Sequence, residues 1–115
     1  MSDVLNPVDV EQTIRETAND IARGVRIVSE AETAARQARA AYDRAYAHAY
    51  LAAPGPAHEK KYHAELATTA ERDAMDVAEL AFRHAERTAK ALDGKLRAFQ
   101  SIGASVRQMY AAGVG

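Results

Sequence analysis

The sequence predicts an all-α fold: a long antiparallel two-helix hairpin of the coiled-coil type. Alanine, a strong helix former, supplies 27 of the 115 residues. One clear loop signal, Ala53-Pro54-Gly55-Pro56, stands near the middle of the chain. Apolar residues recur at steps of three and four on both sides of it. Because proline blocks helix continuation and glycine permits a reversal, we expect two helices folded back at residues 54–56.

The first helix is expected over about residues 7–53. Asn6 can cap its free amide groups, Pro7 suits the first helical position, and Asp9 complements the positive end of the helix dipole. Small and apolar residues then form a heptad seam. Its members are Val10, Ile14, Thr17, Ile21, Gly24, Val28, Ala31, Ala35, Ala38, Tyr42, Ala45 and Ala49.

The second helix is expected over about residues 57–102. Its seam is regular from Met75 onward through Ala78, Phe82, Ala85, Ala89, Leu92, Leu96, Phe99, Gly103, Val106 and Tyr110. Before Met75 a weaker pattern runs through Tyr62, Leu66, Thr69 and Ala70. The two seams predict antiparallel packing within one hairpin domain, residues 1–115.

Counting outward from Gly55 sets the expected register between the helices. It places Ile14 opposite Leu96 and Pro7 opposite Gly103. Gly103 can end or bend the second helix, so residues 103–115 are predicted to form an extension without an intramolecular partner. We therefore predict an association interface on the end of the second-helix seam and on this extension, made of Phe99, Ile102, Val106, Met109 and Tyr110.

A single hairpin buries little apolar area, because alanine side chains are small. Leucine occurs six times, phenylalanine twice and tryptophan never. We therefore expect self-association into a helical bundle, that is, a homo-oligomer. The same heptads also fit a domain-swapped dimer.

Composition argues against several classes of protein. The net charge is −1 with no cysteine, so neither a strong global field nor disulfide chemistry is expected. The segment Met1-Ser2-Asp3-Val4-Leu5 lacks the pattern of a secretory signal. The sequence has no run of about 18 apolar residues, so no transmembrane helix is predicted. We expect a cytoplasmic protein without a membrane partner.

Metal binding and catalysis are not expected. His58 and His63 are five residues apart, about 140° around a helix, whereas two ligands of one metal need a four-residue step. The acidic residues Glu71, Asp73 and Asp76 lack the Glu-x-x-His motif of di-iron bundles. No nucleophile motif and no phosphate loop occur, so we predict no catalytic residues, no metal, no cofactor and no enzymatic activity.

Two features suggest nucleic acid as an alternative partner. Tyr42, Tyr46 and Tyr50 lie on one stripe and can stack on bases, although core packing is the preferred interpretation. Six basic residues gather in the later part of the second helix, whereas residues 57–79 are mainly acidic. The predicted contacts to an anionic partner are Arg83, Arg87, Lys90, Lys95, Arg97 and Arg107.

Two segments carry a family resemblance: RDAMDVAE and FQSIGASVRQMY. Over roughly residues 40–113 the chain resembles small α-helical proteins of tailed bacteriophages and prophages of actinobacteria. Such proteins often sit among replication and recombination genes and have no established catalytic activity. The resemblance implies a phage protein working in the host cytoplasm, and it supplies no site residues.

These observations favour a non-enzymatic interaction protein that docks on a protein partner. The partner is expected to act in DNA replication or recombination, or to be a host protein inhibited during takeover. The alternatives are a direct DNA-binding accessory factor and a structural assembly or scaffold protein.

Overall fold

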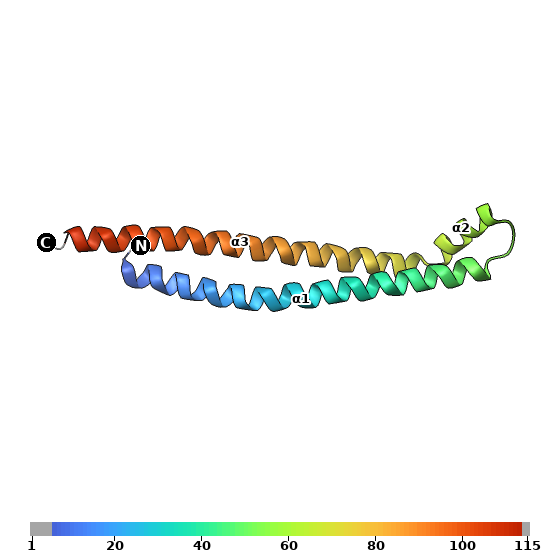
Figure 1. Ribbon diagram of the computed structural model, residues 1–115, viewed down its shortest axis with the longest axis horizontal. Coiled ribbons are helices and arrows are strands. Elements are labelled where there is room, and N and C mark those ends of the chain that lie inside the picture. Colours follow the sequence, from blue (N-terminus) through green and yellow to red (C-terminus); the bar gives the residue numbers. More distant parts are fainter. Residues whose placement is uncertain (1–5, 114–115) are drawn as a thin grey trace. The chain divides into compact units, whose positions relative to one another are not determined.

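The computed structural model describes residues 6–113 of the chain. It contains three helices, α1 Pro7–Ala52, α2 Ala57–Ala67 and α3 Thr69–Gly113 (Figure 1). No strand occurs within residues 6–113. The predicted all-α hairpin is therefore confirmed, and the first helix ends one residue before the predicted boundary.

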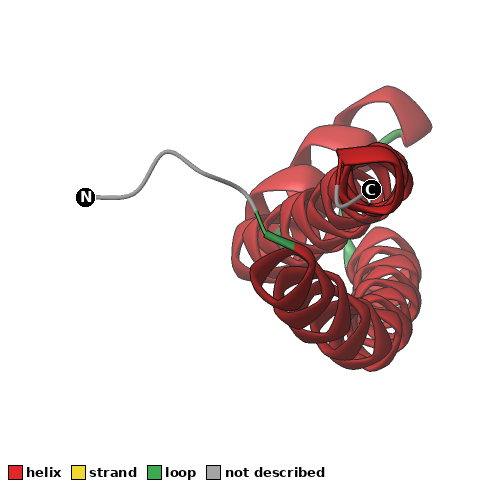
Figure 2. Ribbon diagram, turned by 90° about the vertical axis from the view of Figure 1, so that its left-hand side faces the viewer, coloured by secondary structure: helices red, strands yellow, loops and turns green. Residues whose placement is uncertain are grey.

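The chain divides into two compact units, each built from parts of α1 and α3. Unit 1 comprises Met1–Ile27 with Glu86–Gly115, and unit 2 comprises Val28–Ala85. Within unit 1 the start of α1 lies antiparallel to the end of α3, as Figures 1 and 2 show. Within unit 2 the end of α1 lies beside the start of α3, where Arg39 donates to Glu79 at 2.8 Å.

The start of α1 confirms the predicted cap. The backbone N–H of Asp9 donates to the side-chain oxygen of Asn6 at 2.9 Å, and the Asn6 amide donates to the Asp9 carboxylate at 2.7 Å. These reciprocal bonds satisfy an amide group that the first helical turn leaves without a partner. The cap therefore fixes where α1 begins.

The turn between α1 and α2 depends on Gly55. Its φ of +89° lies in the left-handed region that only glycine adopts without strain. The next residue, Pro56, has an extended backbone, and its carbonyl accepts bonds from the N–H groups of Glu59 at 3.0 Å and Lys60 at 3.1 Å. The predicted reversal at residues 54–56 is confirmed.

The prediction of one continuous helix over residues 57–102 is wrong, because the chain breaks at Thr68. This residue has φ −117° and ψ 21°, and its N–H bonds to the carbonyl of Glu65, three residues back. Its hydroxyl donates to the carbonyl of Ala64 at 2.7 Å, and the Thr69 hydroxyl bonds back to Leu66 at 3.2 Å. Such back-bonding by threonine competes with regular helix bonds and bends helices.

The prediction that the helix ends or bends at Gly103 is also wrong, since α3 runs through this residue to Gly113. Gly103 is buried. A side-chain carbon added there would lie 3.3 Å from a methyl of Val10 and 3.4 Å from a methyl of Ile14. The glycine therefore allows α1 and α3 to approach closely and does not terminate the helix.

The predicted seam is confirmed over most of both helices. Every seam position named on α1, from Val10 to Ala49, is buried or half-buried. On α3 the same holds from Met75 to Val106, whereas Tyr110 is exposed. The weak pattern before Met75 is wrong: Tyr62, Leu66, Thr69 and Ala70 are exposed, while Ala64 and Thr68 are buried.

The register between α1 and α3 differs from the prediction that residues equally distant from Gly55 lie opposite each other. Ile14 lies against Gly103, seven positions beyond the expected Leu96. Glu11 and Arg107 approach to 3.5 Å in the same register. Because α2 and α3 change direction at Thr68, residues 57–68 advance less along α1 than a straight helix would. Each α1 position consequently meets a later position of α3.

Two glycines of α3 offer a matched test of this close approach. Gly94 has open space around the position of a side-chain carbon. Replacing Gly94 with Ala should therefore raise the free energy of unfolding by about 0.5–1 kcal/mol through helix propensity. Gly103→Ala should raise the free energy of unfolding clearly less, because the added methyl group would displace the side chains of Val10 and Ile14. Urea unfolding followed by circular dichroism measures both variants, and equal gains would contradict the close approach.

Candidate interaction surface

The interior of the described chain is small and made mostly of short side chains. The buried apolar residues are Val10, Ala35, Ala64, Ala85 and Val106, and the buried polar residues are Thr17 and Thr68. Because alanine brings little area, each unit gains limited stability from burial. The larger seam residues, such as Phe82, Leu96 and Phe99, are only half-buried.

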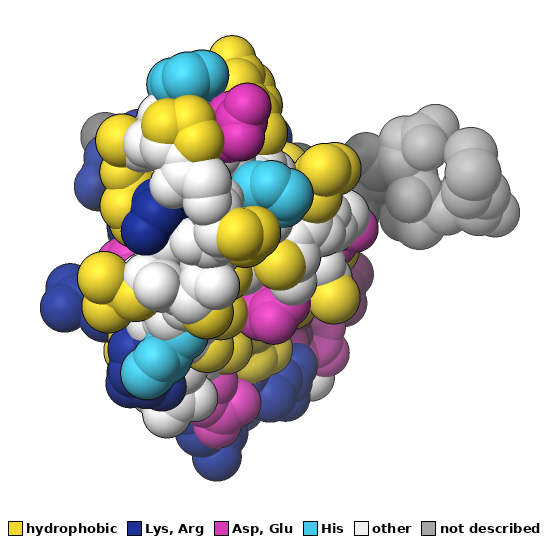
Figure 3. Space-filling view, turned by 90° about the vertical axis from the view of Figure 1, so that its right-hand side faces the viewer, with side chains coloured by type: hydrophobic (Ala, Val, Ile, Leu, Met, Phe, Trp, Pro, Cys, Tyr) yellow, Lys and Arg dark blue, Asp and Glu magenta, His cyan; other side chains and the backbone are white. Residues whose placement is uncertain are grey.

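Ten large hydrophobic side chains are exposed within residues 6–113. In unit 1 they are Val8, Val25, Ile27, Met109 and Tyr110, and in unit 2 they are Leu51, Tyr62, Leu66, Val77 and Leu80. Figure 3 looks toward α2 and the adjoining turn, and shows hydrophobic side chains on the surface among histidines and charged groups. Clusters of exposed apolar groups indicate interaction surfaces, whereas isolated ones are common.

The predicted association residues divide into three kinds. Phe99 and Ile102 are half-buried, and Val106 is buried in the interior of unit 1. Met109 is 69% exposed and Tyr110 is 42% exposed. All five lie within about 100° around α3, since they follow steps of one, three and four. The stripe that packs inside unit 1 as far as Val106 therefore continues into exposed positions. We call Met109 and Tyr110, with half-buried Ile102, the α3 tail surface.

The six basic residues predicted to contact an anion are all exposed. Arg83, Arg87, Lys90 and Arg97 fall within about 80° of one another around α3, whereas Lys95 and Arg107 point to other sides. Ion pairs already involve some of the six. Arg83 lies 3.8 Å from Glu79, Arg97 lies 2.7 Å from Asp93, and Arg107 lies 3.5 Å from Glu11. Nearby carboxylates thus reduce the local field available to an anionic partner.

The predicted stacking residues of α1 contact one another. The ring centroids of Tyr42 and Tyr46 are 6.1 Å apart, and those of Tyr46 and Tyr50 are 6.3 Å apart. All three side chains are half-buried in unit 2. Partial burial together with these mutual contacts agrees with a packing role.

In the part of the chain that the structure describes, histidines and carboxylates do not form a metal-binding cluster. Within residues 6–113 no three potential ligands of a metal ion come together. His58 and His63 are exposed, and Glu79 is engaged by Arg39 and Arg83. Within the same residues, no helix combines the length and the apolarity needed to cross a membrane.

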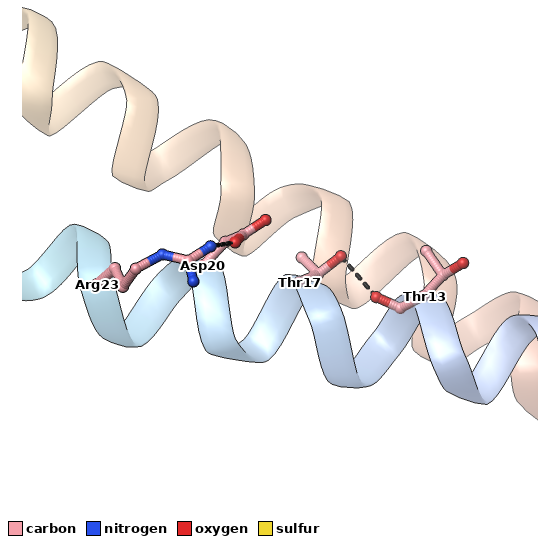
Figure 4. Close-up of polar contacts among 4 residues, drawn as sticks. All are labelled: Thr13, Thr17, Asp20 and Arg23. Carbon is pink, nitrogen blue, oxygen red and sulfur yellow. Dashed lines mark hydrogen bonds and ion pairs between the residues drawn. The ribbon is translucent and has the colours of Figure 1, made fainter.

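A threonine occupies a buried seam position of α1 without leaving an unmet polar group. Thr17 is 1% exposed, and its hydroxyl donates to the backbone carbonyl of Thr13 at 2.8 Å. Figure 4 shows this bond beside the exposed ion pair of Asp20 and Arg23 on the same helix. The polar atoms are satisfied within α1, so this part of the seam serves packing.

Two surface depressions are lined by residues of a single unit. In unit 1 a depression of about 330 Å³ is lined by Glu11, Ile14, Arg15, Gln100 and Arg107. In unit 2 one of about 180 Å³ lies on α2 and is lined by Glu59, Tyr62, His63 and Leu66. In the unit 1 depression the charges of Glu11 and Arg107 partly neutralise each other. The unit 2 depression has two exposed apolar side chains, Tyr62 and Leu66.

The sequence analysis did not predict that Tyr62 and Leu66 of α2 are exposed. It placed the second-helix seam before Met75 on these two residues because their side chains are large and apolar. Stepping back from Met75 by four and three residues leads instead to Glu71, Thr68 and Ala64. These positions are half-buried, buried and buried. Regular spacing of three and four residues thus predicts the buried face of α2 correctly, whereas the size of the side chains does not. The same spacing places Tyr62 and Leu66 on the outer face.

Comparison of the chain with protein-family models, curated proteins and solved structures gave no match. Function must therefore be inferred from the described surface. Its distinguishing feature is exposed apolar area on helices, above all where the seam stripe of α3 emerges at Met109 and Tyr110.

Proposed function

We propose that this protein acts without catalysis, by docking the α3 tail surface on a partner protein. The observation that carries the proposal is the continuation of one apolar stripe from the interior of unit 1 to the exposed end of α3. Residues 107–113 are all exposed and helical. A helix that presents apolar side chains in this way matches the helix-in-groove mode of recognition.

The chemistry of the tail suits this mode. Ile102 and Met109 are seven residues apart, so they repeat on one side of the helix after two turns. Methionine adapts its shape to an irregular groove, and tyrosine supplies a large ring with a polar tip. The expected partner therefore offers an apolar groove with a hydrogen-bonding group at its edge.

The resemblance to small helical proteins of actinobacterial phages supplies the proposed setting. In that setting the chain works in the cytoplasm of the host cell. Its partner is a protein of DNA replication or recombination, or a host protein inhibited during takeover. A scaffold role in assembly is an alternative that uses the same exposed apolar side chains.

Matched variants of the tail test the proposal. Met109→Ser with Tyr110→Ser should lose capture of the partner from a lysate of the native host by at least about tenfold, since anchor side chains dominate binding. Ala111→Ser with Ala112→Ser changes exposed alanines in the next residues and should retain capture. Mass spectrometry of the bound proteins identifies the partner. Equal capture by both variants would remove the tail from the proposed site.

A direct DNA-binding factor is the second candidate, favoured by the shared face of Arg83, Arg87, Lys90 and Arg97. Because carboxylates pair with Arg83 and Arg97, we expect no change in anisotropy of labelled single or double strands at about 50 mM salt. Affinity that falls steeply with salt, and that Arg87→Ala with Lys90→Ala weakens, would establish the DNA function instead.

A further inference from the structure

Two large apolar side chains of unit 2 lie on the side of α3 that faces away from the seam. Val77 is 67% exposed and Leu80 is 62% exposed. At 100° per residue, their mean direction around α3 differs by about 160° from that of the seam residues Met75, Ala78 and Phe82. Packing of α3 on α1 within unit 2 therefore covers neither side chain.

Two carboxylates share this side of α3. Asp73 lies four residues before Val77, and Asp76 lies four residues before Leu80, so each acid is a neighbour of an apolar side chain. Both acids are exposed. The four residues fall within about 100° around the helix and within about 10 Å along it. We call Asp73, Asp76, Val77 and Leu80 the α3 outer surface.

The charges of Asp73 and Asp76 are not balanced inside the described part of the chain. The ion pairs found within residues 6–113 involve neither carboxylate, and Arg72, one turn before Asp76, forms none with it. Acids three residues apart on a helix are neighbours, so they repel each other. The helix dipole does not offset this repulsion, because its effect fades after the first turn, where Glu71 is the acidic residue. Cations of a binding partner would relieve it.

Small residues border the apolar edge of the α3 outer surface. Ala70, Ala74 and Ala81 are exposed and lie within about 60° of Val77 around α3. Short side chains allow the backbone of a second helix to come close, while Val77 and Leu80 supply larger groups for it to pack against. The surface thus has the form of a helix-packing face with an acidic margin.

We propose that the α3 outer surface docks a basic amphipathic helix of a partner protein. The partner helix lays apolar side chains on Val77 and Leu80 and sets lysines or arginines, one turn apart, against Asp73 and Asp76. Charge complementarity selects this occupant, because an acidic helix would add to the repulsion between the two carboxylates and an uncharged helix would leave it in place. The surface belongs to unit 2, so this contact goes beyond the tail docking proposed for unit 1.

A fluorescein-labelled amphipathic peptide of leucine and lysine is the probe, about 18 residues long so that it can form a helix. Its anisotropy should rise with the wild-type chain at about 50 mM salt, and a matched peptide of leucine and glutamate should not bind. Asp73→Asn with Asp76→Asn should weaken binding by at least about fivefold, and Val77→Ser with Leu80→Ser by at least about tenfold. All four side chains are exposed, so the fold should be retained, which circular dichroism checks.

Two control variants separate this surface from general charge and general apolarity. Glu30→Gln with Asp43→Asn removes the same charge from exposed positions of α1 in unit 2. Val25→Ser with Ile27→Ser removes exposed apolar side chains from unit 1. Both controls should keep the wild-type Kd for the lysine peptide to within about twofold, because distant sites act independently. Equal weakening by the α1 acidic control and by the outer-surface acidic variant would reduce the binding to net charge and overturn the proposal.

Three further results would overturn the proposal. The first is no binding of the lysine peptide at about 100 μM of the wild-type chain, and the second is equal affinity for the glutamate peptide. The third is self-association of the wild type that Asp73→Asn with Asp76→Asn removes, because this result would assign the surface to a second copy. The tail variant at Met109 and Tyr110 should retain peptide binding, so the outer surface and the tail docking can fail separately.

Discussion

The close approach of α1 and α3 at small residues is the constraint on which the other features depend. Gly103 lets α3 come within van der Waals contact of Val10 and Ile14, and alanines keep the seam narrow in unit 2. Helices separated by small side chains pack tightly, but they bury little area per contact. The narrow seam therefore defines the fold of each unit, and it leaves ten large hydrophobic side chains of residues 6–113 exposed.

That division of side chains connects the fold with the proposed function. Buried valines, alanines and threonines hold the helices together with half-buried seam residues such as Phe82 and Leu96, and the ten exposed large hydrophobic side chains remain for contacts with other molecules. The end of α3 shows the connection most directly, because one stripe serves both purposes: Val106 packs inside unit 1, while Met109 and Tyr110 continue outward.

Periodicity predicted the helices, the turn and most of the buried face, because heptad spacing and the rules for proline and glycine act locally. It could not predict the break at Thr68, where the backbone leaves helical geometry and two threonine hydroxyls bond to preceding carbonyls. The packing role of Gly103 was not predicted, because glycine occurs both at the ends of helices and where two helices pack closely. The exposed position of Leu66 follows from regular spacing, since steps of four and three back from Met75 lead to Thr68 and Ala64 and leave Leu66 outside. The α3 tail surface was predicted in part, and only the structure separated buried Val106 from its exposed neighbours.

The register across the seam is measured most directly by crosslinking, because every cysteine in a variant of this chain is an introduced one. Cysteines at Ile14 and Gly103 should join within one chain under mild oxidation, because the side chain of Ile14 lies against Gly103 across the seam. Cysteines at Ile14 and Leu96 should not join, because seven residues correspond to about 10 Å along a helix. Faster intramolecular joining of the Ile14 and Leu96 pair would contradict the close approach at Gly103.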